Sequence, residues 1–184
     1  MTLPQLSPKA KLISGLAVLS ALAVIYLFVS AQPKSLAPAW KGIQVGRDSK
    51  DQVVSKLGSP LAATASADGL DRLDFPSSNQ YWPHEVFFKS NTSQLIRERL
   101  LKTTPGELQT YLTRYGQPEA VLNNTLTGLE FYLHVWPASG IAVNANPTAG
   151  VVFEVWYFSP TTLAKFQQAF KAEIGFYPTG EERF

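Results

Sequence analysis

Cysteine is absent from the 184-residue sequence, and histidine occurs only twice. The absence of cysteine excludes disulfide bonds, thiolate metal sites and a thiol nucleophile. The net charge is also small, because the sequence has 16 Lys and Arg residues and 14 Asp and Glu residues. Lys9 and Lys11 account for this small basic excess, so residues 32–184 are neutral on balance. Nucleic-acid-binding domains usually show a clear basic excess, and we therefore expect no nucleic-acid partner.

Recognisable catalytic patterns are missing as well. The sequence has no nucleotide-binding glycine loop and no G-x-S-x-G nucleophile pattern. The two histidines, His84 and His134, lack the close spacing that a metal site requires. The acidic residues that begin at Asp68 lack the glycine and the final glutamate of a calcium loop. We therefore predict no catalytic residue, no metal site and no cofactor, and a protein that is not an enzyme.

A long uncharged run lies near the N-terminus. Residues 12–33 hold no charged side chain, and the segment Leu12–Ala31 is apolar or small throughout. Twenty helical residues span about 30 Å, which is the thickness of the hydrocarbon core of a bilayer. Lys9 and Lys11 precede the run and favour a cytoplasmic N-terminus. We therefore expect a single-pass membrane anchor, N-in, with an extracytoplasmic C-terminal domain.

Two other interpretations of this run stay open. A signal peptide could be cleaved after Val29-Ser30-Ala31, where small residues precede Gln32. The apolar run is longer than the roughly 7 to 15 residues usual for a signal peptide, which favours the uncleaved anchor. A buried core helix is the third possibility. The anchor and the signal peptide both place the rest of the chain outside the cytoplasm.

Two segments of the sequence repeat one helix pattern. In the first, Ser49 and Gln52 fit a capping box, and Gly58 with Pro60 predicts the end of the helix. The second segment, Thr104–Pro118, has the same arrangement of capping residues, apolar helix positions and a final Gly-x-Pro. The sequence therefore predicts two short amphipathic helices with similar starts and stops.

Each of these helices is followed by three strand-like segments in the same order. The matching segments lie roughly 55 to 58 residues apart. A repeat of this length is typical of duplicated supersecondary units. Coincidence is the alternative, because Gly-x-Pro is a common ending for a helix.

The pattern of glycine, polar residues, valine and Leu-Gly-x-Pro, followed by hairpins, resembles the BamE/SmpA/OmlA-like family. Over residues 42–158, two such units in tandem also resemble the fold of the β-lactamase-inhibitor protein. The resemblance implies a pair of small α/β modules with a non-enzymatic binding role outside the cytoplasm. This sequence has no cysteine for N-terminal lipidation. That difference puts in doubt any direct transfer of a role in outer-membrane assembly.

The expected fold is an α+β protein with an N-terminal transmembrane helix, two similar helix-plus-antiparallel-sheet modules and a C-terminal helix. Its boundaries follow a proline-containing linker, the two helix starts and the end of the last amphipathic pattern. They are residues 1–31 for the tail and anchor, 32–41 for the linker, 42–101 for the first module, 102–172 for the second module with the C-terminal helix, and 173–184 for a tail.

Two late strands are apolar or aromatic on both faces. Leu129–Trp136 presents leucine and valine on one face and aromatic side chains on the other, and Val151–Phe158 is similar. A sheet with one solvated face should alternate apolar and polar residues. Either the last helix or the first module covers the second face, or that face binds a protein partner. The candidate partner-binding residues are Tyr132, His134, Trp136, Trp156 and Phe158.

These features predict a membrane-anchored, extracytoplasmic, non-catalytic module that binds or scaffolds a protein partner in or near the membrane, in an envelope assembly. A secreted inhibitor-like binding protein is one alternative, favoured by a cleaved N-terminus. A carrier of a lipid or another small ligand is a second alternative, favoured if the doubly apolar strands line a cavity. An enzyme would need carboxylates or His134 to converge in a cleft.

Overall fold

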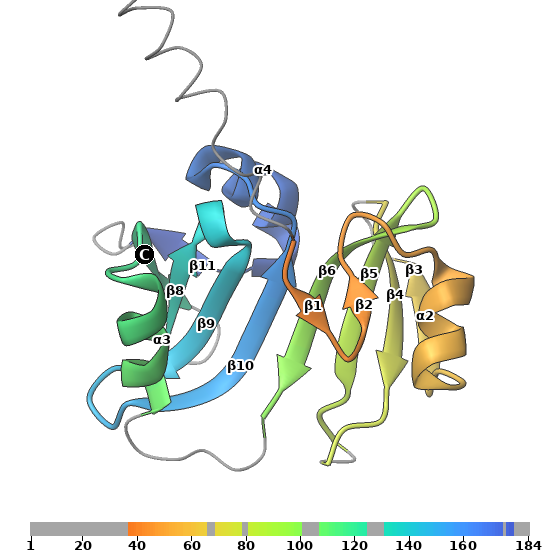
Figure 1. Cartoon of the computed structure of the whole chain (residues 1–184), viewed down its shortest axis with the longest axis horizontal. Helices are drawn as coiled ribbons and strands as arrows, with labels where there is room; N and C mark the ends of the chain where they lie inside the picture. Colours follow the sequence, from red (N-terminus) through yellow and green to blue (C-terminus); the bar gives the residue numbers. More distant parts are fainter. Residues whose placement is uncertain are drawn as a thin grey trace, which may run out of the picture. The chain divides into compact units, whose positions relative to one another are not determined.

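The computed structural model describes residues 37–65, 69–78, 81–100, 107–124, 131–174 and 176–178. Its main feature is one antiparallel sheet of nine strands (Figure 1). A separate two-stranded ribbon is formed by β1 (Ala39–Trp40) and β2 (Ile43–Gln44). The strands of the large sheet, in spatial order, are β11 (Phe176–Pro178), β7 (Ala120–Asn124), β8 (Tyr132–Trp136), β9 (Ile141–Asn146), β10 (Val151–Phe158), β6 (Thr92–Arg99), β5 (His84–Lys89), β4 (Asp71–Phe75) and β3 (Ala62–Ala65).

The two runs of four consecutive strands, β3–β6 and β7–β10, join through their last strands. β6 and β10 pair antiparallel, with Leu95 opposite Phe158 and Arg99 opposite Glu154. This pairing makes the sheet continuous across the two runs. It corrects the expectation of two similar helix-plus-antiparallel-sheet modules, because one backbone ladder and one shared core cross the expected boundary.

Two strands that the sequence did not predict complete the runs. The sequence predicted three strand-like segments after each helix, whereas each run has four strands, and β3 and β7 are the additional ones. Alanine is a poor strand former, and Ala62–Ala65 is a strand because it pairs with β4. Trp40, placed in the expected linker, lies in β1 of the ribbon and is buried against side chains of β4, β5 and β6.

Helix α2 (Lys50–Leu57) forms where the local signals predict it. The Ser49 side chain accepts the backbone N–H of Gln52, and the Gln52 side chain accepts the backbone N–H of Ser49, so the capping box is complete. Gly58 has a φ of 86° and donates its N–H to the carbonyl of Val54, which ends the helix. The apolar side of α2 is buried through Val53.

Three other helical segments complete the fold. Helix α3 (Glu107–Tyr115) precedes β7, and its predicted N-cap Thr104 lies outside the described residues. A 3₁₀ turn, η1 (Pro137–Ser139), joins β8 to β9 and ends at Gly140. A Cβ on Gly140 would lie 2.2 Å from the carbonyl oxygen of Phe158, so only glycine allows this close approach of β9 to β10. Helix α4 (Leu163–Ile174) follows β10.

The sheet is covered on both faces. On the first face, the ribbon and α2 cover the β3–β6 run, and α3 covers the β7–β10 run. On the second face, α4 packs through Phe166 and Phe170 onto side chains from both runs. The core on the second face consists of Leu70, Phe87, Leu95, Leu122, Leu133, Val135, Ala142, Trp156, Phe158, Phe166 and Phe170.

No helix among the described residues is long and apolar enough to cross a membrane. Helices α2, α3 and α4 have 8, 9 and 12 residues, whereas a membrane span needs about 20. This finding corrects the expectation of a single-pass membrane protein with an N-terminal transmembrane helix. The segment that carried this expectation, residues 12–31, lies outside the described residues.

Candidate interaction surface

The aromatic residues predicted to bind a partner are divided between the two faces of the sheet. Trp156 and Phe158 of β10 are 0% and 1% exposed on the second face. The Phe166 ring of α4 lies 6.3 Å from the Trp156 ring and 4.6 Å from the Phe158 ring, measured between centroids. These two side chains therefore belong to the core beneath α4.

The three predicted residues of β8 lie on the first face. Trp136 is buried, its ring centroid lies 5.9 Å from that of Tyr115 in α3, and its Nε1–H donates to the Gly116 carbonyl at 2.9 Å. His134 is also buried and stacks beside Trp136, while Tyr132 is half-buried. The structure thus does not bring the five predicted residues together on one exposed surface.

Each of the two histidine rings has a backbone contact at its Nδ1 atom. His134 Nδ1 lies 3.1 Å from the Tyr132 carbonyl oxygen, so Nδ1 carries the proton. His84 Nδ1 accepts the backbone N–H of Arg99 at 3.1 Å, and its Nε2 lies 3.4 Å from the Lys41 ammonium nitrogen. Burial lowers the pKa of both rings, and Lys41 lowers that of His84 further. Neither arrangement resembles a general base that faces a substrate.

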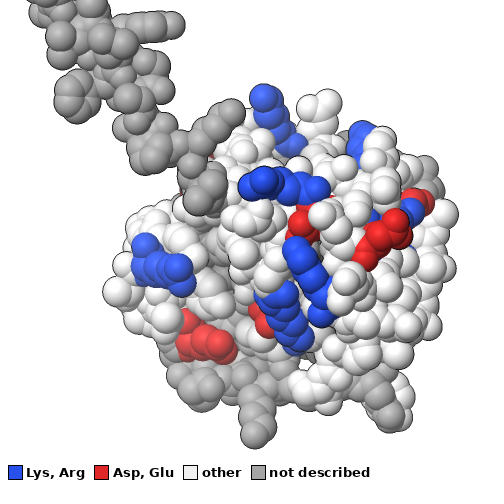
Figure 2. Space-filling model, turned by 45° about the vertical axis from the view of Figure 1, so that its right-hand side comes forward, with Lys and Arg blue, Asp and Glu red and all other residues white. Residues whose placement is uncertain are grey.

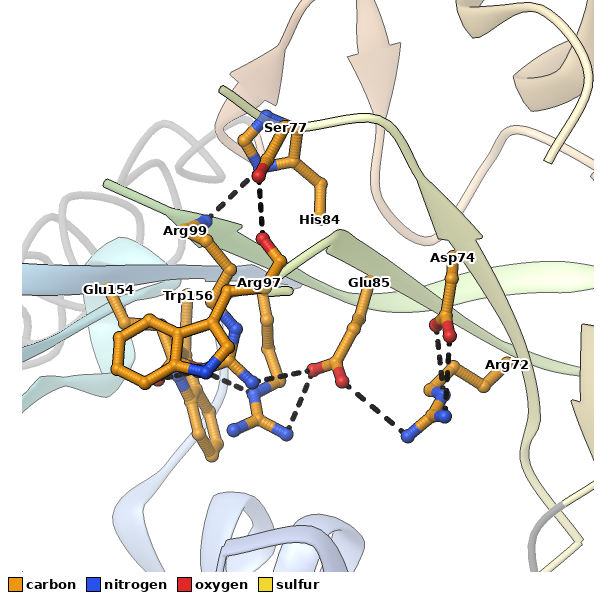
Figure 3. Close-up of polar contacts among 10 residues, drawn as sticks. Arg72, Asp74, Ser77, His84, Glu85, Arg97, Arg99, Glu154 and Trp156 are labelled. Carbon is orange, nitrogen blue, oxygen red and sulfur yellow. Dashed lines mark hydrogen bonds and ion pairs between the residues drawn. The ribbon is translucent and has the colours of Figure 1, made fainter. Parts of the chain in front are cut away.

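A network of charged side chains crosses β4, β5, β6 and β10 on the second face (Figure 3). We call this network the charged stripe. Glu85 lies at its centre, 3.1 Å from both the Arg97 and Arg99 guanidinium groups. Arg72 lies 3.5 Å from Glu85 and 3.0 Å from Asp74. The stripe consists of Arg72, Asp74, Glu85, Arg97, Arg99 and Glu154.

Glu154 is the most buried member of the stripe. Its two carboxylate oxygens lie 2.5 Å from Arg97 Nε and 2.6 Å from an Arg99 guanidinium nitrogen. Burial alone would raise the pKa of Glu154, but Arg97, Arg99 and the Trp156 indole N–H outweigh it and lower the pKa. Because Glu154 lies on β10 and its partners on β6, these contacts connect the two runs of strands.

Trp156 marks the border between the core and the charged stripe. One part of its ring packs against α4, while the guanidinium carbon of Arg97 lies 4.9 Å from the ring centroid. On the first face, the Tyr157 hydroxyl donates to Glu98 at 2.7 Å and also joins β10 to β6. The stripe therefore has a clear structural role at the junction of the two runs.

Large exposed apolar side chains gather at one end of the β3–β6 run. Leu61, Tyr81 and Trp82 are 62%, 79% and 54% exposed. Leu61 donates its N–H to the Asp74 carbonyl near the end of β4, and the Tyr81–Trp82 segment leads into the start of β5. The end of β4 and the start of β5 lie side by side, so these three side chains share one end of the sheet. We call them the apolar end.

The charged side chains of the described residues are mixed in sign. Figure 2 shows basic and acidic side chains interspersed with uncharged surface on the side of the molecule that it presents. Within the charged stripe, three arginines likewise face three carboxylates. This balance gives no reason to expect a polyanionic partner.

Two other kinds of site find little support among the described residues. No group of three or more histidine, aspartate or glutamate side chains there could hold a metal ion. A hollow of about 470 Å³ is lined by Gln109, Thr110, Thr113 and Arg114 of α3. The hollow is open to solvent and is lined by one helix alone, so it is not the enclosed cavity between strands that a lipid carrier would need.

Sequence signals for both surfaces exist but were not recognised. Arg97 and Arg99 are two positions apart in a strand, so their side chains share one face. Glu85 and Glu154 interrupt apolar strands, which indicates charges that need partners. The adjacent Tyr81 and Trp82 lie in a turn-rich segment, where large aromatic side chains have little local core to join.

Comparisons with known proteins show a shared fold but no family. No family model and no curated protein matches this chain. A crystal structure of a cysteine-rich secretory protein from Staphylococcus aureus subsp. aureus Mu50 is similar, with a TM-score of 0.50 and 12% sequence identity. The match covers 82% of this chain and 52% of that protein, so this chain spans about half of its length. At this identity the likeness is one of fold alone.

Proposed function

We propose that the described part of this chain is a non-catalytic module that binds a protein partner through the apolar end. The observation that carries this proposal is the exposure of Tyr81 and Trp82 beside Leu61 at one end of the sheet. Tyrosine and tryptophan are enriched among the residues that dominate interface energies, because they combine large apolar area with a polar group.

The local structure supports the display of these side chains to a partner. The Ser77 hydroxyl donates to the Trp82 carbonyl at 2.6 Å, and this hydrogen bond connects two residues of the loop between β4 and β5. Pro83 follows Trp82 directly and restricts its backbone to extended conformations. Such restraint lowers the entropy that a binding segment loses on association. The apolar end is therefore better prepared for binding than a free loop.

The proposal is tested by identifying and then measuring a partner. Full-length protein, tagged and immobilised, would capture proteins from extracts of its source cells, and mass spectrometry would identify them. A purified candidate would then be titrated by calorimetry against the protein and its variants. The Tyr81→Ala/Trp82→Ala double variant should lose about 30-fold or more in affinity, which corresponds to about 2 kcal/mol.

A matched control uses an exposed side chain elsewhere. Gln109→Ala on α3 removes an exposed side chain far along the chain from the apolar end and should leave the affinity unchanged. Circular dichroism and unfolding curves would establish that both variants are folded. If the double variant binds as tightly as the parent protein, the apolar end is not the binding surface and the proposal fails.

A further inference from the structure

We propose that the edge strand β3 accepts an extended segment of the partner protein as an additional strand, an inference that rests on the proposed binding function. β3 is the last strand of the sheet formed by the described residues, with β4 as its neighbour. All four of its residues, Ala62–Ala65, are exposed. Alternate backbone N–H and C=O groups on its outer side can pair with another chain.

This edge lacks the charge and proline that often protect a sheet from pairing. Natural edge strands are very short, carry charged residues or proline, or are covered by another element, and of these features the four-residue β3 shows only short length. The sequence of β3 is Ala-Ala-Thr-Ala, and Pro60 lies before the strand rather than in it. The opposite edge of the sheet, β11, has only three residues and ends in Pro178. The two edges therefore differ in their capacity to accept a strand.

The side chains of β3 leave room for a guest strand. Ala62 lies opposite Asp74 and Thr64 opposite Arg72, so both lie on the second face, while Ala63 lies opposite Leu73 on the first. Larger side chains of a guest strand could pack over these small residues on both faces. Leu61, directly before β3, offers an apolar contact at the apolar end. Backbone pairing and an apolar anchor thus lie next to each other.

The size of the edge favours an extended segment over a second copy of this chain. Four residues make a strand about 13 Å long. Pairing of two such strands buries far less than the roughly 1,200 Å² of a standard stable interface. An extended segment gains from the same backbone bonds and can also contact Leu61, directly before β3, with its side chains. We therefore assign the edge to an extended segment with an apolar residue toward the apolar end.

The experiment uses linear ten-residue peptides selected from a displayed library against the full-length protein. The best peptide is synthesised in two forms, N-methylated at its odd or at its even residues. Strand pairing uses the backbone of alternate residues, so one form should lose about 30-fold or more in affinity and the other less than about 3-fold. Hydrogen exchange at Ala62–Ala65 should slow when the unmodified peptide binds.

Several outcomes would overturn the inference. Equal loss with both methylated forms, or no change in hydrogen exchange at β3, would mean that the peptide binds by side chains alone. Recovery of no peptide would exclude an extended ligand. Protection of β3 in the concentrated protein without peptide, together with a dimer in ultracentrifugation, would identify a second copy as the occupant.

The same experiment distinguishes this inference from the proposed function. A peptide that is lost with Trp82→Ala but is insensitive to N-methylation leaves the apolar end as a binding site and removes only the strand pairing. Failure of the proposed function is recognised separately, when the Tyr81→Ala/Trp82→Ala variant binds the purified partner with unchanged affinity.

Discussion

The two runs of four strands have the same local order but differ in what covers them. Both follow a short helix that packs on the first face, α2 for β3–β6 and α3 for β7–β10. The β7–β10 run is also bordered by β11, whereas α4 packs on a core that the second faces of both runs share. The β3–β6 run ends in an exposed edge strand and contributes most residues of the charged stripe.

This difference shows that similar local architecture can serve two purposes. In the β7–β10 run, aromatic side chains on both faces are buried and contribute to stability. In the β3–β6 run, the exposed apolar side chains lie at the end of the strands, away from the core. The β3–β6 run is therefore the part of the sheet that can bind a partner while its core stays covered. Five predictions test this contrast, from the largest expected effect to the smallest.

Trp156→Ala should cause the largest loss of stability, about 4 kcal/mol, because it removes a fully buried ring from the core beneath α4. The loss should be visible as a lower midpoint of urea unfolding monitored by circular dichroism. The variant also leaves Arg97 without its aromatic neighbour. A loss below about 1 kcal/mol would show that Trp156 is not part of the core.

Glu154→Ala should cost about 3 kcal/mol, because it leaves the guanidinium groups of Arg97 and Arg99 without their shared carboxylate. Since the folded-state pKa of Glu154 is lowered, its contribution is present above the unfolded pKa of about 4.3 and is lost as the pH falls through the folded value. The free energy of unfolding, measured by urea titration between pH 7 and pH 3, should therefore decrease less with falling pH in the variant than in the parent protein. Glu154→Gln, which keeps the shape, is the matched control and should lose less.

Tyr157→Phe tests the second connection between β6 and β10. The variant removes a hydroxyl that donates to Glu98 at 2.7 Å and should cost about 1 to 2 kcal/mol. Glu98→Gln weakens the same hydrogen bond from the other side. In a double-mutant cycle the two losses should be non-additive, because the two residues act through one contact. Simple additivity would show that the hydrogen bond does not join the strands.

Acidification from about pH 7 to pH 5 should lower the free energy of unfolding. The pKa values of His84 and His134 are lowered in the folded state, so the unfolded chain binds more protons in this range. Their contribution is complete above the unfolded pKa of about 6.5 and is lost as the pH falls toward the folded values. Urea titrations at several pH values should show this slope, and it should flatten in a His84→Gln/His134→Gln variant. An unchanged slope would mean that other groups cause it.

Local elements of this fold could be predicted from the sequence, whereas their assembly could not. Helix α2 begins at Ser49 and ends before Gly58, because capping and termination are determined by neighbouring residues. The pairing of Leu95 with Phe158 joins residues far apart in the chain, and no local sequence pattern predicts it. The prediction of two similar helix-plus-sheet modules was wrong for this reason.

The candidate surface was missed for a related reason. Trp156 and Trp82 are the same amino acid, and the sequence alone does not show which of them is covered by a helix. The lack of apolar-polar alternation along β10 indicated that both of its faces were apolar. It did not indicate that α4 covers one of them. The aromatic residue in a turn-rich segment, Trp82, is exposed, whereas the aromatic residue within a strand, Trp156, is buried.

Trp82→Ala should have the smallest effect on stability, less than about 0.5 kcal/mol, because more than half of the Trp82 side chain is exposed. Urea unfolding of Trp82→Ala and Trp156→Ala under the same conditions gives a direct comparison of the two runs. A loss near 3 kcal/mol for Trp82→Ala would mark its ring as part of a core. In that case the β3–β6 run would be closed like its counterpart, and a partner could reach the apolar end only after local unfolding. A small loss instead means that the fold does not depend on the Trp82 ring, so this side chain is free to contact a partner protein.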